Sequence, residues 1–78
     1  IQASQKNEAE LMIDWFIKYC KDNQTTEIGQ RSFMQKLTPK KLRVKDVFWN
    51  NLNFLAETNH IFIDEINKKI NINPQILT

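Results

Sequence analysis

Residues 31–59 read RSFMQKLTPKKLRVKDVFWNNLNFLAETN, and they contain the most informative pattern of the chain. The apolar residues of this stretch recur every three or four positions, which predicts a short helix over 30–37 and a longer one that begins near Val44. Thr38-Pro39 interrupts the pattern, because proline is tolerated in a first helical turn but not in a helix interior. A turn of a few residues therefore separates the two helices, which is the outline of a helix-turn-helix. The stripe of the longer helix consists of Val44, Val47, Phe48, Leu52 and Leu55, and Thr58-Asn59 closes it.

Before this stretch, residues 5–22 are expected to form the first helix. Ser4 is a suitable N-cap, because its hydroxyl can accept a hydrogen bond from the first turn. A second apolar line runs beside the main stripe, so we expect this helix to be covered on more than one side. The main stripe consists of Ala9, Met12, Ile13, Phe16, Ile17 and Cys20, and the second line of Leu11, Trp15 and Tyr19.

After Asn59 the apolar period changes from that of a helix to that of a strand. Residues 60–66 and 70–73 alternate, which predicts a β-hairpin with a loop at 67–69. A β-branched segment at 25–28 can supply one more short strand. The order of elements predicts a mainly α winged helix-turn-helix: three helices and a two- to three-stranded antiparallel wing sheet.

Length and composition indicate one small domain. The 78 residues are 41% hydrophobic and contain a single cysteine, so neither a disulfide framework nor a cysteine-rich zinc site supports the fold. No stretch approaches the roughly 18–20 apolar residues of a membrane helix, so we expect no membrane contact and a cytoplasmic location. Because the chain begins at Ile1, we expect residues 1–78 to be one domain of a longer protein.

The net charge of +2 is the sum of two opposed regions. The window from residue 31 to residue 45 has a charge of +6 and no acidic residue, and the rest of the chain has −4. In a helix-turn-helix this window faces a duplex, where basic side chains neutralise phosphates. The alternative is a solvated basic face. The six basic residues are Arg31, Lys36, Lys40, Lys41, Arg43 and Lys45.

Four further side chains are candidates outside that set. Asn50 lies opposite the apolar stripe of the longer helix, where an asparagine can contact adenine. Trp49 could stack on a base, or it could pack against the rest of the fold. Lys68 and Lys69 lie at the predicted wing tip, where they either reach a groove or make a solubilising loop.

Nothing in the sequence indicates catalysis, a cofactor or a metal. A single glycine excludes a glycine-rich phosphate cradle, and no nucleophile and base stand at a catalytic spacing. His60 has no ligand partner on its own element, and Cys20 lies on the stripe of the first helix as a small core residue. We therefore expect a domain that is not an enzyme.

The stretch from Thr26 to Asp64, followed by INPQIL, resembles the C-terminal winged-helix region of replication proteins of the primase-helicase type from phages and mobile elements. The matching positions include the Leu42-Arg43 step into a leucine-containing helix and the final Asn73-Pro74. Asn59 stands where the family often has glycine. The resemblance implies an accessory DNA-binding or positioning module of a replication protein, with any catalytic domains elsewhere.

The sequence is therefore compatible with two functions. The first is a non-catalytic DNA-binding module that uses the basic window and the wing, with DNA and neighbouring domains as partners. The second is the same fold used to bind another protein or domain through exposed apolar side chains. The candidate residues for that second surface are Leu11, Trp15, Trp49 and Phe54.

Overall fold

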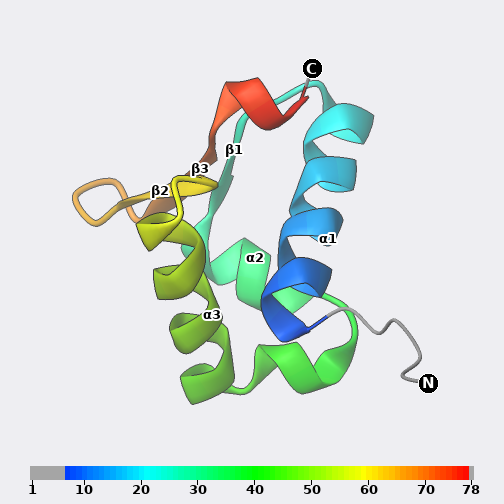
Figure 1. The fold of residues 1–78 in the computed structure, drawn as a ribbon, viewed down its shortest axis with the longest axis vertical. Helices are drawn as coiled ribbons and strands as arrows, with labels where there is room; N and C mark the ends of the chain where they lie inside the picture. The colour runs from blue at the N-terminus through cyan, green and yellow to red at the C-terminus, as the bar shows by residue number, and fades with distance from the viewer. Residues whose placement is uncertain (1–6, 78) are drawn as a thin grey trace.

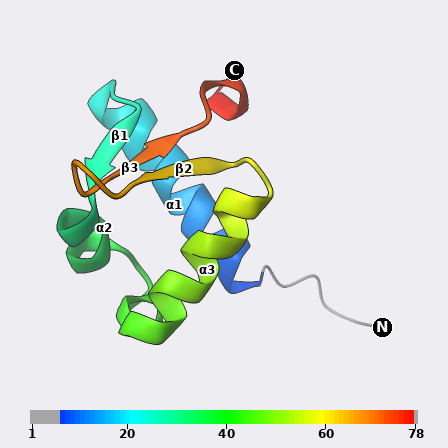
Figure 2. The same cartoon turned by 90° about the vertical axis from the view of Figure 1, so that its left-hand side faces the viewer.

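The computed structural model describes residues 7–77 of the chain. Its helices pack against one face of a three-stranded antiparallel sheet (Figures 1 and 2), and the predicted winged helix-turn-helix class is confirmed. Within 7–77 every helix is too short or too polar to span a membrane. In chain order the elements are α1 (Glu8–Asn23), β1 (Glu27–Gly29), α2 (Gln30–Lys36), the 3-10 helix η1 (Lys40–Arg43), α3 (Lys45–Glu57), β2 (Ile61–Asp64), β3 (Lys69–Ile72) and the 3-10 helix η2 (Pro74–Leu77).

Helix α1 begins later than the sequence predicted. The side chain of Asn7 accepts a hydrogen bond from the backbone N–H of Glu10 (2.9 Å), and the Glu10 carboxylate accepts one from the N–H of Asn7 (3.4 Å). This reciprocal capping box fixes the first turn at Glu8. The predicted cap, Ser4, lies outside the described residues. At the other end Gln24 adopts the left-handed conformation, which terminates the helix.

The core lies between α1, α3 and the inner face of the sheet, and Phe33 of α2 is central to it. Its ring is fully buried and lies 4.9 Å from the ring of Phe16, 5.5 Å from that of Phe48 and 5.3 Å from that of Trp15. The predicted stripe of α1 is buried except for Ile17, which is partly covered. Four aromatic side chains from three helices therefore meet at one point, which ties α2 to both long helices.

The turn between α2 and α3 contains a short helix of its own. Leu37 and Leu42 are fully buried on either side of Thr38-Pro39, so the connection is anchored into the core at both ends. The Arg43 Nε donates a hydrogen bond to the carbonyl oxygen of Leu37 at 2.6 Å, which closes the turn. Val44, predicted on the buried stripe, is instead 57% exposed, because it precedes the first turn of α3 in an extended conformation and does not follow the helical period.

The sheet has the strand order β1-β3-β2, and all neighbours are antiparallel. Its inner face is formed by alternate isoleucines: Ile28, Ile61, Ile70 and Ile72 are buried and Ile63 is partly buried. The prediction that the first hairpin strand extends to Ile66 is wrong, because the Asp64 carboxylate binds the next backbone amides and turns the chain. Lys69, predicted in the loop, is the first residue of β3.

Cys20 provides a test of core packing. Its side chain is 1% exposed, and burial raises the pKa of the thiol from 9.0 to about 11. Because the thiolate is the reactive form, we expect a thiol reagent at about pH 8 to modify Cys20 roughly 100-fold more slowly in the folded protein than in denaturant. The rate of labelling, followed by mass spectrometry, checks this. Equal rates in the two conditions would contradict the buried placement.

Candidate nucleic-acid interface

The structure places most of the basic window on the surface of the helix-turn-helix. Arg31 lies in the first turn of α2, Lys40 and Lys41 lie in η1, and Lys45 is the first residue of α3. All four side chains are exposed. Figure 2 shows η1 and the start of α3 at the lower end of the molecule, with α2 above them. The segments that carry the four cations therefore follow one another along the chain, from α2 through the turn to the start of α3.

Two of the predicted contact residues also contact other parts of the protein. Arg43 is partly buried, and its Nε donates a hydrogen bond to the carbonyl oxygen of Leu37. Lys36 is exposed, and its Nζ lies 5.9 Å from the centre of the Tyr19 ring of α1. Sequence reasoning could not separate these two from the other four, because both contacts depend on how the helices pack.

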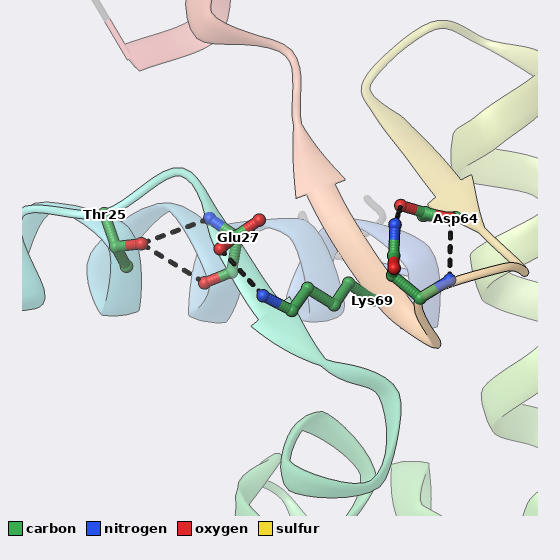
Figure 3. A network of polar contacts seen from close by, with 5 residues as sticks. Thr25, Glu27, Asp64 and Lys69 are labelled. Carbon is green, nitrogen blue, oxygen red and sulfur yellow. Dashed lines mark hydrogen bonds and ion pairs between the residues drawn. The ribbon is translucent and has the colours of Figure 1, made fainter.

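The cations Arg31, Lys40, Lys41 and Lys45 have no acidic partner within residues 7–77. The ion pair found there joins the Lys69 Nζ to the Glu27 carboxylate at 3.1 Å, across the neighbouring strands β1 and β3 (Figure 3). Lys69 is therefore occupied on the outer face of the sheet and does not lie at the wing tip. An exposed pair of this kind contributes at most about 1 kcal/mol to stability.

The outward face of α3 is not uniformly suited to DNA. Its exposed polar residues are Asp46, Asn50, Asn53 and Glu57, with Lys45 at the start of the helix. A phosphate is attracted at Lys45 and repelled along the rest of this face. Asn50, the candidate for base contact, is exposed, as that role requires.

The wing loop is an ordered turn at residues 65–68. Asp64 accepts hydrogen bonds from the backbone N–H groups of Ile66 (3.1 Å) and Asn67 (3.0 Å) and from the Asn67 side chain (2.9 Å). The N–H of Gln30 donates to the carbonyl of Lys68 at 2.9 Å, which joins the loop to the start of α2. The fold thus brings Lys68 close to Arg31, a juxtaposition that no sequence pattern indicated.

The pH dependence of this loop is predictable. Hydrogen bonds from the Asn67 backbone and side chain hold the pKa of Asp64 below its usual value of 3.8. The folded pKa is therefore the lower one, so the carboxylate's contribution is complete above the unfolded value and is lost as pH falls through the folded pKa. We expect the amide NMR signals of Ile66 and Asn67 to titrate together with a midpoint below 3.8. In Asp64→Ala these amides should show no such transition, and a midpoint at or above the usual value would contradict the turn.

The four candidate interface residues do not form one patch. Trp15 lies 5.4 Å from the Tyr19 ring and also stacks on Phe33, and Trp49 packs edge-on against Phe48, so both tryptophans are partly buried. Leu11 is also partly covered. Phe54 is 51% exposed and lies about 140° around α3 from Trp49. It lines a hollow of about 490 Å³ with Asn7, Glu8, Ala9 and Asn51.

His60 contacts a neighbouring hydroxyl. Its Nδ1 lies 2.7 Å from the Thr58 Oγ1, just beyond the end of α3. In the part of the chain that the structure describes, no three His, Cys, Asp or Glu side chains are grouped to hold a metal ion.

Comparison with known proteins identifies the domain. No curated protein and no solved structure matches the chain. Residues 7–73 match the family model of the YfjI-like C-terminal winged helix domain. The matched residues include every element from α1 to β3. This match agrees with the observed order of helices and strands and with the antiparallel wing. The chain therefore belongs to the family of YfjI-like C-terminal winged helix domains.

Proposed function

We propose that this domain is a non-catalytic module that binds duplex DNA. Arg31, Lys40, Lys41 and Lys45 contact phosphates, and Lys68 adds a contact from the wing. The observation that carries the proposal is the position of these four cations: they are exposed, lack a described acidic partner, and follow the helix-turn-helix from α2 to the start of α3. That is the part of this motif that meets a duplex.

The contacts inside the protein refine the set of DNA-binding residues. Arg43 sets the shape of the turn through Leu37, so it positions the lysines beside it. Lys36 and Lys69 were candidates for phosphate contact, but one lies over Tyr19 and the other is paired with Glu27. We assign these two lysines a smaller share of the affinity.

The charges on α3 determine how the domain approaches DNA. Asp46 and Glu57 disfavour a helix lying with its full length along the backbone, whereas Lys45 favours contact at its start. The helix therefore enters by its N-terminal end, with Asn50 as the side chain within reach of a base. Because phosphate contacts dominate, we expect weak sequence preference.

The wider setting is also part of the proposal. The resemblance of residues 26–77 to replication proteins of the primase-helicase type supports a place in a phage or mobile-element replication protein. There the domain would hold DNA for catalytic domains outside these 78 residues. We also propose a cytoplasmic location.

Salt-titrated binding of a short fluorescent duplex tests the function. Five phosphate contacts predict a slope of log K against log salt of about −4.5, at about −0.9 per contact. The control is Lys21→Gln, which removes one exposed lysine of α1 and should leave the slope unchanged. Absence of binding at low salt, or a slope near zero, would reject the proposal.

The hollow beside Phe54 favours a second candidate function, a protein-interaction module. A half-exposed aromatic ring next to a hollow of about 490 Å³ is the kind of surface that another protein covers. Sedimentation equilibrium tests it through self-association. A dimer that Phe54→Ser dissociates would support this function, and a monomer at high protein concentration would reject self-association.

A further inference from the structure

Ile66 is the most exposed large apolar side chain in the described residues. It is 92% exposed, whereas Val44, Phe54 and Phe62 are each covered over nearly half of their surface. The loop that carries it projects beyond α3 and away from the body of the domain (Figure 1). An isoleucine in this position buries nothing within the domain, so its apolar surface remains available to a partner.

Hydrogen bonds within the loop fix the backbone at Ile66, so that its side chain stays away from the core. The Asp64 carboxylate accepts hydrogen bonds from the backbone N–H groups of Ile66 and of the next residue, Asn67. Lys68 completes the turn in the left-handed conformation (φ 56°), which a residue with a Cβ rarely adopts. Glycine or asparagine would fit this position with less strain, so the presence of lysine is consistent with a use for its charge.

The tip is also fixed relative to the helix-turn-helix. Gln30, the first residue of α2, donates its N–H to the Lys68 carbonyl (2.9 Å) and its side-chain amide to the Asp64 carbonyl (3.4 Å). Arg31 follows Gln30 in α2, so Lys68 and Arg31 both lie on the side of the loop that faces α2. The acidic residues beside Ile66 are Asp64, whose carboxylate is bound to the loop amides, and Glu65. The exposed apolar residue is thus held next to two cations that the proposed function places on phosphates.

We propose that Ile66 is an apolar wedge that enters the minor groove and partly unstacks one base step. Apolar side chains inserted between base steps are a known means of kinking a duplex, and the two cations on the α2 side of the loop would hold the backbone beside that step. A protein partner is disfavoured, because one side chain at a loop tip provides far less than the roughly 800 Å² per partner of a stable interface. This inference rests on the proposed DNA binding and adds how the wing loop would contact the duplex.

A mismatched duplex tests the wedge. Unstacking is easier beside a mismatch, so the wild-type domain should bind a short duplex with one central mismatch about tenfold more tightly than the matched duplex. Ile66→Ser should bind both equally, with an unchanged salt slope. Because Ile66 is exposed, this change leaves the fold intact, as circular dichroism will show. Phe62→Ser is the matched control: it removes an exposed apolar side chain from the outer face of β2 and should keep the tenfold preference.

The outcomes separate this inference from the function on which it rests. Salt-dependent binding without a mismatch preference in the wild type would reject the wedge and retain the DNA-binding function. A preference that persists in Ile66→Ser would also reject it. Failure to bind either duplex would reject the proposed function itself, and the wedge with it.

Discussion

Replacing Phe33 with alanine is expected to lower the free energy of unfolding by about 3–5 kcal/mol. The ring is fully buried, and it packs against Phe16, Phe48 and Trp15, so its loss leaves a cavity that rigid aromatic neighbours cannot fill. Domains as small as this one bury a modest fraction of their surface and are only marginally stable. The variant should therefore be largely unfolded near physiological temperature. Urea denaturation followed by circular dichroism measures the change.

The control for this experiment is another phenylalanine. Phe62 lies on the outer face of β2 and is 53% exposed, so Phe62→Ala should cost less than about 1 kcal/mol. Similar losses for the two variants, or a loss below about 1 kcal/mol at Phe33, would show that Phe33 is not the centre of the core.

Neutralising Lys40, Lys41 and Lys45 together to glutamine is expected to weaken duplex binding by roughly 100- to 1000-fold at about 0.1 M salt. Each lost phosphate contact removes about 0.9 from the salt slope, which corresponds to about eightfold in affinity at that concentration. The slope should become shallower by about 2.7. Because all three side chains are exposed, the unfolding transition should not change. Fluorescence anisotropy at several salt concentrations gives both quantities.

General electrostatic attraction is the alternative explanation to exclude. A variant with Lys21 changed to glutamine loses charge on the exposed surface of α1, outside the set that we propose to contact phosphate. It should keep the wild-type slope and lose less than about threefold in affinity, since separated charges are screened at this salt concentration. The affinity lost per lysine should be much smaller on α1 than at Lys40, Lys41 and Lys45. Equal losses per lysine would show that these three do not form a specific phosphate-binding surface.

The elements of the fold were predictable because their signals are local. The apolar stripe from Val47 to Leu55 indicates which side of α3 faces the core. The alternation of Ile70 and Ile72 indicates the same for β3, and both predictions were confirmed. The errors lie at boundaries, where one side chain overrides the periodicity. Asn7 starts α1 by capping it, and Asp64 ends β2 by capturing the amides that would otherwise extend the strand.

The candidate site was less predictable, because the fold makes some of its contacts between residues far apart in sequence. The positive window was visible, and the structure exposes most of it. The pairing of Lys69 with Glu27 and the contact of Gln30 with Lys68 join β1 and the start of α2 to the wing, and no local pattern contains them. Even the shorter contact from Arg43 to Leu37 depends on how the turn folds. Charge counting alone could not separate the cations that hold the fold from those free to meet a partner.

The junction between β1 and α2 has a mechanical consequence. Gly29 is both the last residue of β1 and the N-cap of α2, so the sheet passes into the helix-turn-helix without a loop. Gln30 is also bound to the wing, so the helix-turn-helix and the wing, the two surfaces that we propose to meet a duplex, are joined directly. In the proposed complex the domain would therefore act as a rigid template. The protein would have little conformational freedom to lose on binding, and adaptation of shape would come from the nucleic acid.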